Sequence, residues 1–430
     1  MLARTLRKFL RAEAAGITAF GLFMFSASVL MASYAIDVSN LEQQRTLLQA
    51  TADSAAHDAL ETRETAAQVT AVAAARTRVG AMMNPNVYGR ALTAEDVVFG
   101  TWDTGKRVFT PKPGSITAVR VTLRRTAATG NAVVTYLMKL VGVPQLDVVT
   151  TSTFLSYQPA CLQEGFVAEG IVNVRSNNSY GICIHSNTYV SLNSNNYFAP
   201  GTEVSMPDLS LLSIPASGLK SNAGLSEALR QNRLDIRVLK RIQRIISQVA
   251  DPSSPYYPAF LTDPTPIALT KSSIDATDLV RGHVYVWNCG SGNGGTIAKG
   301  ALVSGVVIIT DCDVTLANGS ALEDTILLTT STSAMSIKSP NGFRLGKDDH
   351  CVVGGGARIV SMGGMHFAAH LQLFGSQLLA MGDIDFAAQA DGEGVSVISN
   401  GVISGTSNMT MTHCSGGIDE FTAGYFRMVD

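Results

Sequence analysis

A stretch of 23 residues without a charged side chain, Ala14 to Ile36, constrains this chain more than any other feature. Four basic residues, Arg4, Arg7, Lys8 and Arg11, precede it. A helix needs roughly 20 apolar residues to cross the hydrocarbon core of a bilayer, and basic residues hold their end of a helix in the cytoplasm. The sequence therefore predicts a membrane helix, with Asp37 at its exit and the rest of the chain beyond the membrane.

The predicted anchor includes basic residues, apolar residues and one glycine. They are Arg4, Arg7, Lys8, Arg11, Gly16, Phe20, Phe23, Phe25, Leu30 and Ile36. The alternative is a cleaved signal peptide, because Ser33-Tyr34-Ala35 has the small-x-small pattern of a cleavage site. Retention is favoured, since the apolar run exceeds the roughly 7 to 15 residues of a signal-peptide core.

Six cysteines follow the membrane segment, which fits an oxidising compartment. Their order suggests the local pairs Cys161 with Cys183, Cys289 with Cys312 and Cys351 with Cys414. Six cysteines admit about 15 connectivities, so the sequence leaves the pairing open. The formal net charge of -2 gives no electrostatic reason to expect nucleic acid as a partner.

Residues 37–83 lack proline, contain no glycine before Gly80, and predict one helix continuous with the membrane span. Asn84-Pro85 ends it. Strand-like runs separated by turn residues follow and predict an antiparallel sheet. They are Val97–Phe99, Arg107–Thr110, Ala118–Leu123, Ala132–Val141 and Leu146–Phe154.

Together with the basic leader and the apolar span, several short motifs carry a resemblance to a known family. They are Thr51-Ala52-Asp53-Ser54-Ala55-Ala56, Gly100-Thr101-Trp102-Asp103, Ala118-Val119-Arg120-Val121-Thr122 and Gly130-Asn131. In order and spacing, residues 1–155 resemble the TadG-like family of bacterial Tad (Flp) pilus-assembly proteins. The resemblance implies a pilin-like α+β module in the bacterial inner membrane, with its bulk in the periplasm, acting in assembly or anchoring of a pilus.

The rest of the chain alternates short apolar clusters with Asn, Ser and Gly, a rhythm typical of a right-handed parallel β-helix. Between two such regions, Leu225 to Val249 predicts a basic amphipathic helix. Its residues Arg230, Arg237, Lys240 and Arg244 are candidates for docking on an acidic partner or membrane. A solvated charged face on a packed helix is the favoured interpretation.

The predicted fold is therefore α+β followed by a mainly β head. The predicted segments are a leader (1–13), a membrane helix (14–36), a pilin-like module (37–155), a first β-rich segment (156–217), a linker with the basic helix (218–251) and a β-helix-like domain (252–430).

Catalytic candidates are few. Asp311 with Asp313, Asp348 with Asp349, and Asp383 with Asp385 have the pairing that polysaccharide-cleaving β-helices use, but acids at turns explain them more simply. His366 and His370 on one strand would lie about 13 Å apart, too far to share a metal ion.

The sequence thus predicts a non-enzymatic pilus component without cofactor or metal. Its expected partners are inner-membrane lipid and other Tad components, including pilin subunits, with a host surface, abiotic surface or polysaccharide as a target of the head. The alternatives are a membrane-tethered β-helix that binds or cleaves polysaccharide, and a surface adhesin.

Overall fold

The computed structural model describes residues 14–430 except 291–293, 388 and 415–417. The chain divides into two compact units. The helix–sheet unit is Met1–Tyr157 with Gly424–Asp430, and the solenoid unit is Gln158–Ala423. The last seven residues thus belong to the helix–sheet unit, although the sequence placed them with the β-helix.

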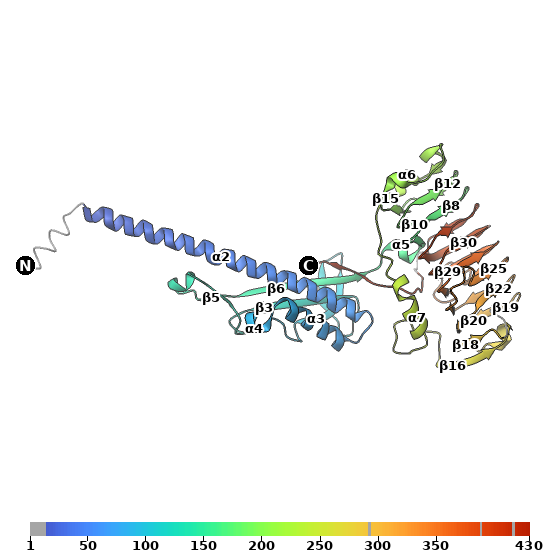
Figure 1. Ribbon diagram of the computed structural model, residues 1–430, viewed down its shortest axis with the longest axis horizontal. Coiled ribbons are helices and arrows are strands. Elements are labelled where there is room, and N and C mark those ends of the chain that lie inside the picture. The colour runs from blue at the N-terminus through green and yellow to red at the C-terminus, as the bar shows by residue number, and fades with distance from the viewer. Residues whose placement is uncertain (1–13, 291–293, 388, 415–417) are drawn as a thin grey trace, which may run out of the picture. The chain divides into compact units, whose positions relative to one another are not determined.

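Helix α2 (Ala14–Arg63) runs unbroken for 50 residues, a length of about 75 Å at 1.5 Å per residue. The single helix predicted to Met83 is wrong, because the chain turns after Arg63 and α3 (Gln68–Met82) folds back onto α2 (Figure 1). Arg63 stabilises the turn by donating to the carbonyls of Ala66 and Gly114. Buried alanines on both helices, such as Ala56, Ala59 and Ala75, allow close contact between the helices.

An antiparallel sheet lies against these helices, in the strand order β2-β1-β3-β6-β34. The strands are β1 (Val97–Asp103), β2 (Val108–Pro111), β3 (Ala118–Arg125), β6 (Val148–Tyr157) and β34 (Tyr425–Met428). Val119, Val121 and Leu123 are fully buried while the residues between them are half-exposed, as their alternation predicted. The final strand β34 pairs with β6, so the chain returns to this sheet after forming the solenoid.

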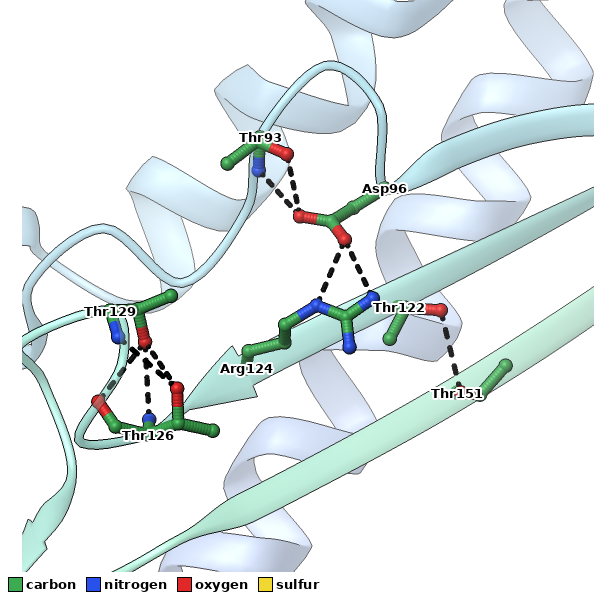
Figure 2. A network of polar contacts seen from close by, with 7 residues as sticks. All are labelled: Thr93, Asp96, Thr122, Arg124, Thr126, Thr129 and Thr151. Carbon is green, nitrogen blue, oxygen red and sulfur yellow. Dashed lines mark hydrogen bonds and ion pairs between the residues drawn. The ribbon is translucent and has the colours of Figure 1, made fainter.

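Hydrogen bonds and an ion pair between side chains hold the polar loops at one end of the sheet (Figure 2). Asp96 accepts from Thr93 and is paired with Arg124 at 3.0 Å. Asn131, from the Gly-Asn motif, donates to the carbonyls of Tyr88, Arg90 and Arg124. Asn131 therefore links the loop after β3 to the short helix α4 (Pro85–Tyr88).

The strand predicted over Ala132–Val141 is wrong. Only β4 (Val133–Val134) is extended there; it pairs with β5 (Gln145–Leu146), and the 3-10 helix η1 (Met138–Val141) lies between them. The backbone N–H groups of Tyr136, Leu137 and Met138 donate to the carboxylate of Asp37 on α2 instead of to a neighbouring strand.

The solenoid unit is a parallel β-solenoid with three faces (Figure 1). The first face stacks β16 (Asp263–Thr270), β18 (His283–Asn288), β21 (Val307–Thr310), β24 (Thr325–Thr329), β27 (Ala357–Ser361), the second halves of β29 (Leu371–Ala380) and β31 (Ala390–Ser399), β7 (Gly165–Ala168), β10 (Cys183–Ser186), β13 (Val204–Met206) and β15 (Leu229–Gln231).

The second face stacks β20 (Leu302–Ser304), β23 (Ala321–Glu323), β26 (Arg344–Leu345), the first halves of β29 and β31, β33 (Thr410–Thr412), β9 (Ser179–Tyr180), β12 (Asn196–Phe198) and β14 (Asn222–Ala223). The third stacks β17 (Ser273–Ile274), β19 (Gly294–Ile297), β22 (Asp313–Leu316), β25 (Ile337–Ser339), β28 (Met365–Phe367), β30 (Ile384–Phe386), β32 (Ile403–Ser404), β8 (Val172–Val174) and β11 (Val190–Leu192). Gly375 and Gly394 have positive φ where β29 and β31 bend from the second face to the first.

The coils do not stack in chain order. β7, the first solenoid strand in sequence, lies between β31 and β10, so the chain builds outward from the middle, crosses over through residues 232–262, and returns from the other end (Figure 1). Phe343, Phe367, Phe386 and Phe166 stack inside the solenoid with centroids 5.6–6.3 Å apart, across the junction between late and early coils. The two β-helix regions of the sequence therefore share one core.

From β24 to β13 the first face is buried on both sides, whereas its outermost strands β16 and β15 are partly exposed. Val284, Val307 and Ile326 alternate with residues of the inner core, yet they are at most 1% exposed. Returning segments lie over this face: α7 (Ile242–Gln248) contacts β27, and Phe421 exchanges two hydrogen bonds with Gln377.

The basic helix predicted over Leu225–Val249 is not formed. The segment contains α6 (Leu225–Ala228), strand β15, an irregular stretch, the 3-10 helix η4 (Leu239–Arg241) and α7. Leu229 to Gln231 pair in parallel with β13, so the edge of the solenoid competes successfully with helix propensity. The remaining short helices are α5 (Ala160–Gln163), η2 (Leu209–Leu211), η3 (Gly218–Ser221) and η5 (Ala276–Asp278).

Three disulfides join Cys161 to Cys183, Cys289 to Cys312 and Cys351 to Cys414, the local pairs that cysteine order suggested. All three lie in the solenoid unit.

Candidate functional site

The first half of α2 exposes large apolar side chains on all sides. Phe20, Phe23 and Phe25 are 64–67% exposed, and Leu30 and Ile36 about half. A water-soluble helix would turn such residues into a core, whereas a membrane helix presents them to lipid. In the described part of the chain, α2 is the one helix that is long and apolar enough to cross a membrane.

Of the other predicted anchor residues, Gly16 alone is described. Gly16 falls within α2, whereas Arg4, Arg7, Lys8 and Arg11 lie outside the described residues.

Other parts of the chain begin to bury residues of α2 only at the end of its apolar run. Between Ile17 and Asn40 the buried positions are Ser33 and Asp37, which are 5% and 1% exposed and lie one turn apart. The Asp37 carboxylate accepts three backbone N–H bonds, from Tyr136 at 2.5 Å, Leu137 at 3.0 Å and Met138 at 2.6 Å. Burial raises the pKa of Asp37, but these three bonds outweigh it, and the pKa lies below its ordinary value.

Sequence reasoning missed this site. Asp37 was taken only as the end of the membrane span, and its partners were assigned to a strand. The available signal was a single acidic residue directly after the apolar run and a second apolar stretch, VVTYLMKLVGV, with Lys139 as its one charge.

The Thr51–Ala56 motif is a packing element. Thr51, Ala52, Ala55 and Ala56 are fully buried, and the Thr51 hydroxyl donates to the Leu47 carbonyl. The exposed side of the same turns borders an open pocket of about 380 Å³, in which Asp58 is paired with Arg78 at 2.6 Å. This ion pair ties α2 to α3.

The third face of the solenoid presents a straight column of polar side chains. Strand register places Thr296, Thr315, Lys338, His366, Asp385, Ser404, Asn173 and Ser191 in one row. All are exposed or half-exposed. Neighbouring strands are about 4.8 Å apart, so this face is a regular array of hydroxyl, amide and charged groups.

Three of the candidate acids, Asp313, Asp383 and Asp385, are held in structural contacts. Asp313 accepts from Ser331 at 2.5 Å, Asp383 accepts from the Val402 N–H at 2.7 Å, and Asp385 contacts His366 at 2.9 Å. A corner separates His366, on β28, from His370, which has φ of +50° and contacts Asn341. The expectation that both histidines share one strand is therefore wrong.

The larger pocket of the solenoid, about 630 Å³, contains a buried guanidinium. Arg358 is paired with Asp419, donates to its carbonyl, and lies 4.8 Å from the Phe421 ring centroid. Burial raises the pKa of nearby Glu420 to about 9, and the Glu164 charge adds to this. Gln158 donates to one Glu420 oxygen, while the other has no hydrogen-bond partner among the described atoms.

A second pocket, about 540 Å³, is lined by the first disulfide, Glu164, Glu203 and His413. Glu164 is buried and accepts from His413 at 2.6 Å and from the Cys414 N–H at 2.9 Å. Cys161, Cys183 and Glu203 lie close enough together for a metal, but the two sulfurs form a disulfide and offer no thiolate.

The basic candidates do not form one surface patch on a helix. Arg230 lies on β15, Arg237 in the irregular stretch, Lys240 in η4 and Arg244 in α7. Lys240 is paired with Asp235 at 2.5 Å, and Arg230 donates to the carbonyls of Glu227 and Leu229.

Two family matches divide along the same line as the structure. Residues 54–153 match a family described as "Putative Tad-like Flp pilus-assembly". Residues 165–415, more than half of the chain, match a family described as "Domain of unknown function (DUF7867)", and the chain belongs to that family. The helix–sheet unit thus contains a Tad-like pilus-assembly domain.

Among solved structures, an ice-binding protein from an Arctic yeast (LeIBP), described for its antifreeze activity, is similar with a TM-score of 0.25 and 12% identity. The similarity covers 61% of this chain and 96% of that one. No property of that protein is carried over at this score. No curated protein matches the chain.

Proposed function

We propose that this chain is a membrane-anchored, non-enzymatic component of a Tad-type pilus, similar to TadG-like proteins, which holds its solenoid outside the inner membrane. The observation that supports this most is the continuity of α2. Its first half exposes apolar residues suited to lipid, its second half packs in the core of the helix–sheet unit, and its last ten residues, 54–63, fall within the Tad-like match.

In this proposal the basic leader keeps the N-terminus cytoplasmic, and everything after Asp37 is periplasmic or enters the filament. Three disulfides in the solenoid fit an oxidising compartment. The chain then acts by contact: α2 inserts beside other pilus helices or fixes the assembly complex, and the solenoid provides a binding surface.

The test compares protease accessibility of the solenoid in intact cells, spheroplasts and detergent-lysed cells. Cleavage in spheroplasts supports the proposed topology, and cleavage on intact cells as well supports incorporation into the pilus. Protection in spheroplasts with cleavage only after lysis contradicts the proposal. Pilus counts in cells lacking the chain, with and without complementation, test the assembly role.

The polar column on the third face favours one candidate target for the head, a polysaccharide or other hydroxyl-rich surface. Replacing Thr315 and Ser404 by Leu would break the column while leaving inner residues unchanged, and should reduce retention on immobilised polysaccharide. Leu replacements at the exposed positions Ser226 and Ser247, outside this face, are the matched control. Loss of polymer length in the same assay, abolished by Asp313→Asn with Asp385→Asn, would instead identify a cleaving enzyme.

A further inference from the structure

The segment from Val133 to Leu146, called the hairpin below, has an apolar surface that no described part of the helix–sheet unit covers. Val134, Tyr136, Leu140 and Val141 are 55–74% exposed. Lys139 is the one charged residue in the hairpin. Exposed apolar side chains concentrated in one segment mark an interaction surface.

The hairpin is attached to α2 where the apolar run ends. Asp37 binds the N–H groups of Tyr136, Leu137 and Met138, and the Asn40 amide donates to the Val134 carbonyl at 3.5 Å. η1 also contacts α2 directly. The hairpin therefore lies at a fixed level along the helix, beside Asp37 and Asn40.

That level corresponds to the surface of the bilayer. The 23 residues from Ala14 to Ile36 span about 34 Å as a helix, against roughly 30 Å for the hydrocarbon core. The last turn before Asp37 thus lies where hydrocarbon meets headgroups, and the exposed side chains of Tyr34 and Ile36 are at this level.

We propose that the hairpin inserts its apolar tip into the outer surface of the same membrane, as a second lipid contact beside α2. Its composition suits this depth: Tyr136 is an interfacial side chain, Leu140 and Val141 reach the acyl boundary, and Lys139 extends its ammonium group to lipid phosphate. Its apolar surface continues the lipid-facing surface of α2, so lipid is its occupant.

A second contact with the membrane would restrict the rotation and tilt of α2. A single helix rotates and tilts freely, whereas a helix with a rigidly attached interfacial hairpin has a preferred rotation relative to the membrane plane. The hairpin therefore sets the orientation of the helix–sheet unit on the membrane. This inference rests on the proposed membrane anchor.

The experiment measures depth with spin labels on single added cysteines in the full chain, its three disulfides kept, in vesicles of phosphatidylcholine and phosphatidylglycerol. Leu140→Cys reports on the hairpin. Phe23→Cys reports on the anchor, and Val108→Cys, 50% exposed on β2 of the same unit, is the matched surface control. Collisions with lipid-soluble oxygen and with a water-soluble nickel chelate give the depth of each label.

If the inference is correct, the label at position 140 collides with oxygen in several-fold excess over the label at position 108 and lies shallower than the label at position 23. A lipid-embedded label at 23 with an aqueous label at 140 overturns the hairpin contact and leaves the anchor standing. Aqueous labels at both positions overturn the anchor as well. A label at 140 shielded from both reagents identifies a protein partner in place of lipid and overturns the inference.

Discussion

At Asp37, one carboxylate decides the conformation of a segment about 100 residues further along the chain. Its two oxygens satisfy three backbone donors that an isolated 3-10 turn would leave unpaired. Other single residues act in a similar way. Asn131 ties the end of α4 and the residues after it to β3, and the Gln377 side chain makes the two backbone hydrogen bonds to Phe421 that a neighbouring strand would make.

Asp37→Asn should free the hairpin, because a carboxamide has one acceptor oxygen and its NH₂ group would face backbone donors. In detergent, trypsin should then cleave after Lys139 several-fold faster than in the native chain. Asp53→Asn, on the same helix, is the control and should leave the rate unchanged. Because the pKa of Asp37 is lowered in the folded chain, its carboxylate stabilises the fold fully at pH values above the ordinary pKa of an aspartate. This stabilisation is lost only as the pH falls through the lowered pKa. Equal cleavage in both variants would show that the hairpin does not depend on Asp37.

Glu420→Gln should stabilise the solenoid unit at alkaline pH. The folded chain retains a proton that the unfolded chain releases between the ordinary pKa of 4.5 and about 9, so the free energy of unfolding falls as pH rises across this window. Removing the acid should flatten this slope and add about 1–3 kcal/mol at pH 9. Denaturant unfolding followed by fluorescence of the buried Trp287 measures it. The exposed Glu227→Gln is the control, and a gain of the same size there would refute the role of Glu420.

At the scale of elements, small side chains and two-sided burial decide the packing. α2 and α3 approach through alanines, and the middle of the first solenoid face is buried on both sides where segments such as α7 and the chain at Phe421 lie over it. An edge strand also overrides helix propensity: β15 extends the solenoid within a sequence that has helical periodicity.

Ala55→Leu should destabilise the helix–sheet unit by about 1–3 kcal/mol, because Ala55 is fully buried and added methylenes force its neighbours apart. Ala50→Leu, five residues earlier on the same helix and exposed, should be nearly neutral. Thermal unfolding of both variants in detergent, followed by circular dichroism, separates the two outcomes. A neutral effect at Ala55 would mean that the helices are not in close contact there.

At the scale of the whole molecule, the solenoid is an insertion within the helix–sheet unit. The chain leaves that unit after Tyr157 and returns at Gly424, and Tyr157 pairs with Tyr425 in the same sheet. Building the solenoid outward from its middle coil brings both ends of the insertion to central coils, since β7 adjoins β31.

Replacing Gln158–Gly424 by Asn-Gly should therefore leave a folded helix–sheet unit, because two residues of this type close a hairpin between the paired residues Tyr157 and Tyr425. The shortened chain should insert in membranes and melt in one cooperative transition. A chain ending at Tyr157, which lacks β34, is the control and should melt at a lower temperature. If the Asn-Gly variant is unfolded, the solenoid is required for the folding of the helix–sheet unit.

Local composition and periodicity were enough to predict the apolar helix from Ala14, the sheet alternation of Val119 to Leu123 and the parallel solenoid. Cysteine order only suggested the pairs that the fold then formed. Tertiary structure alone decided the break after Arg63, the irregular segment after Ala132, the loss of the basic helix, and the return of β34 to β6. In each of these cases a partner far away in sequence satisfies the backbone or covers the apolar surface, and a pattern within a short window contains no information about that partner.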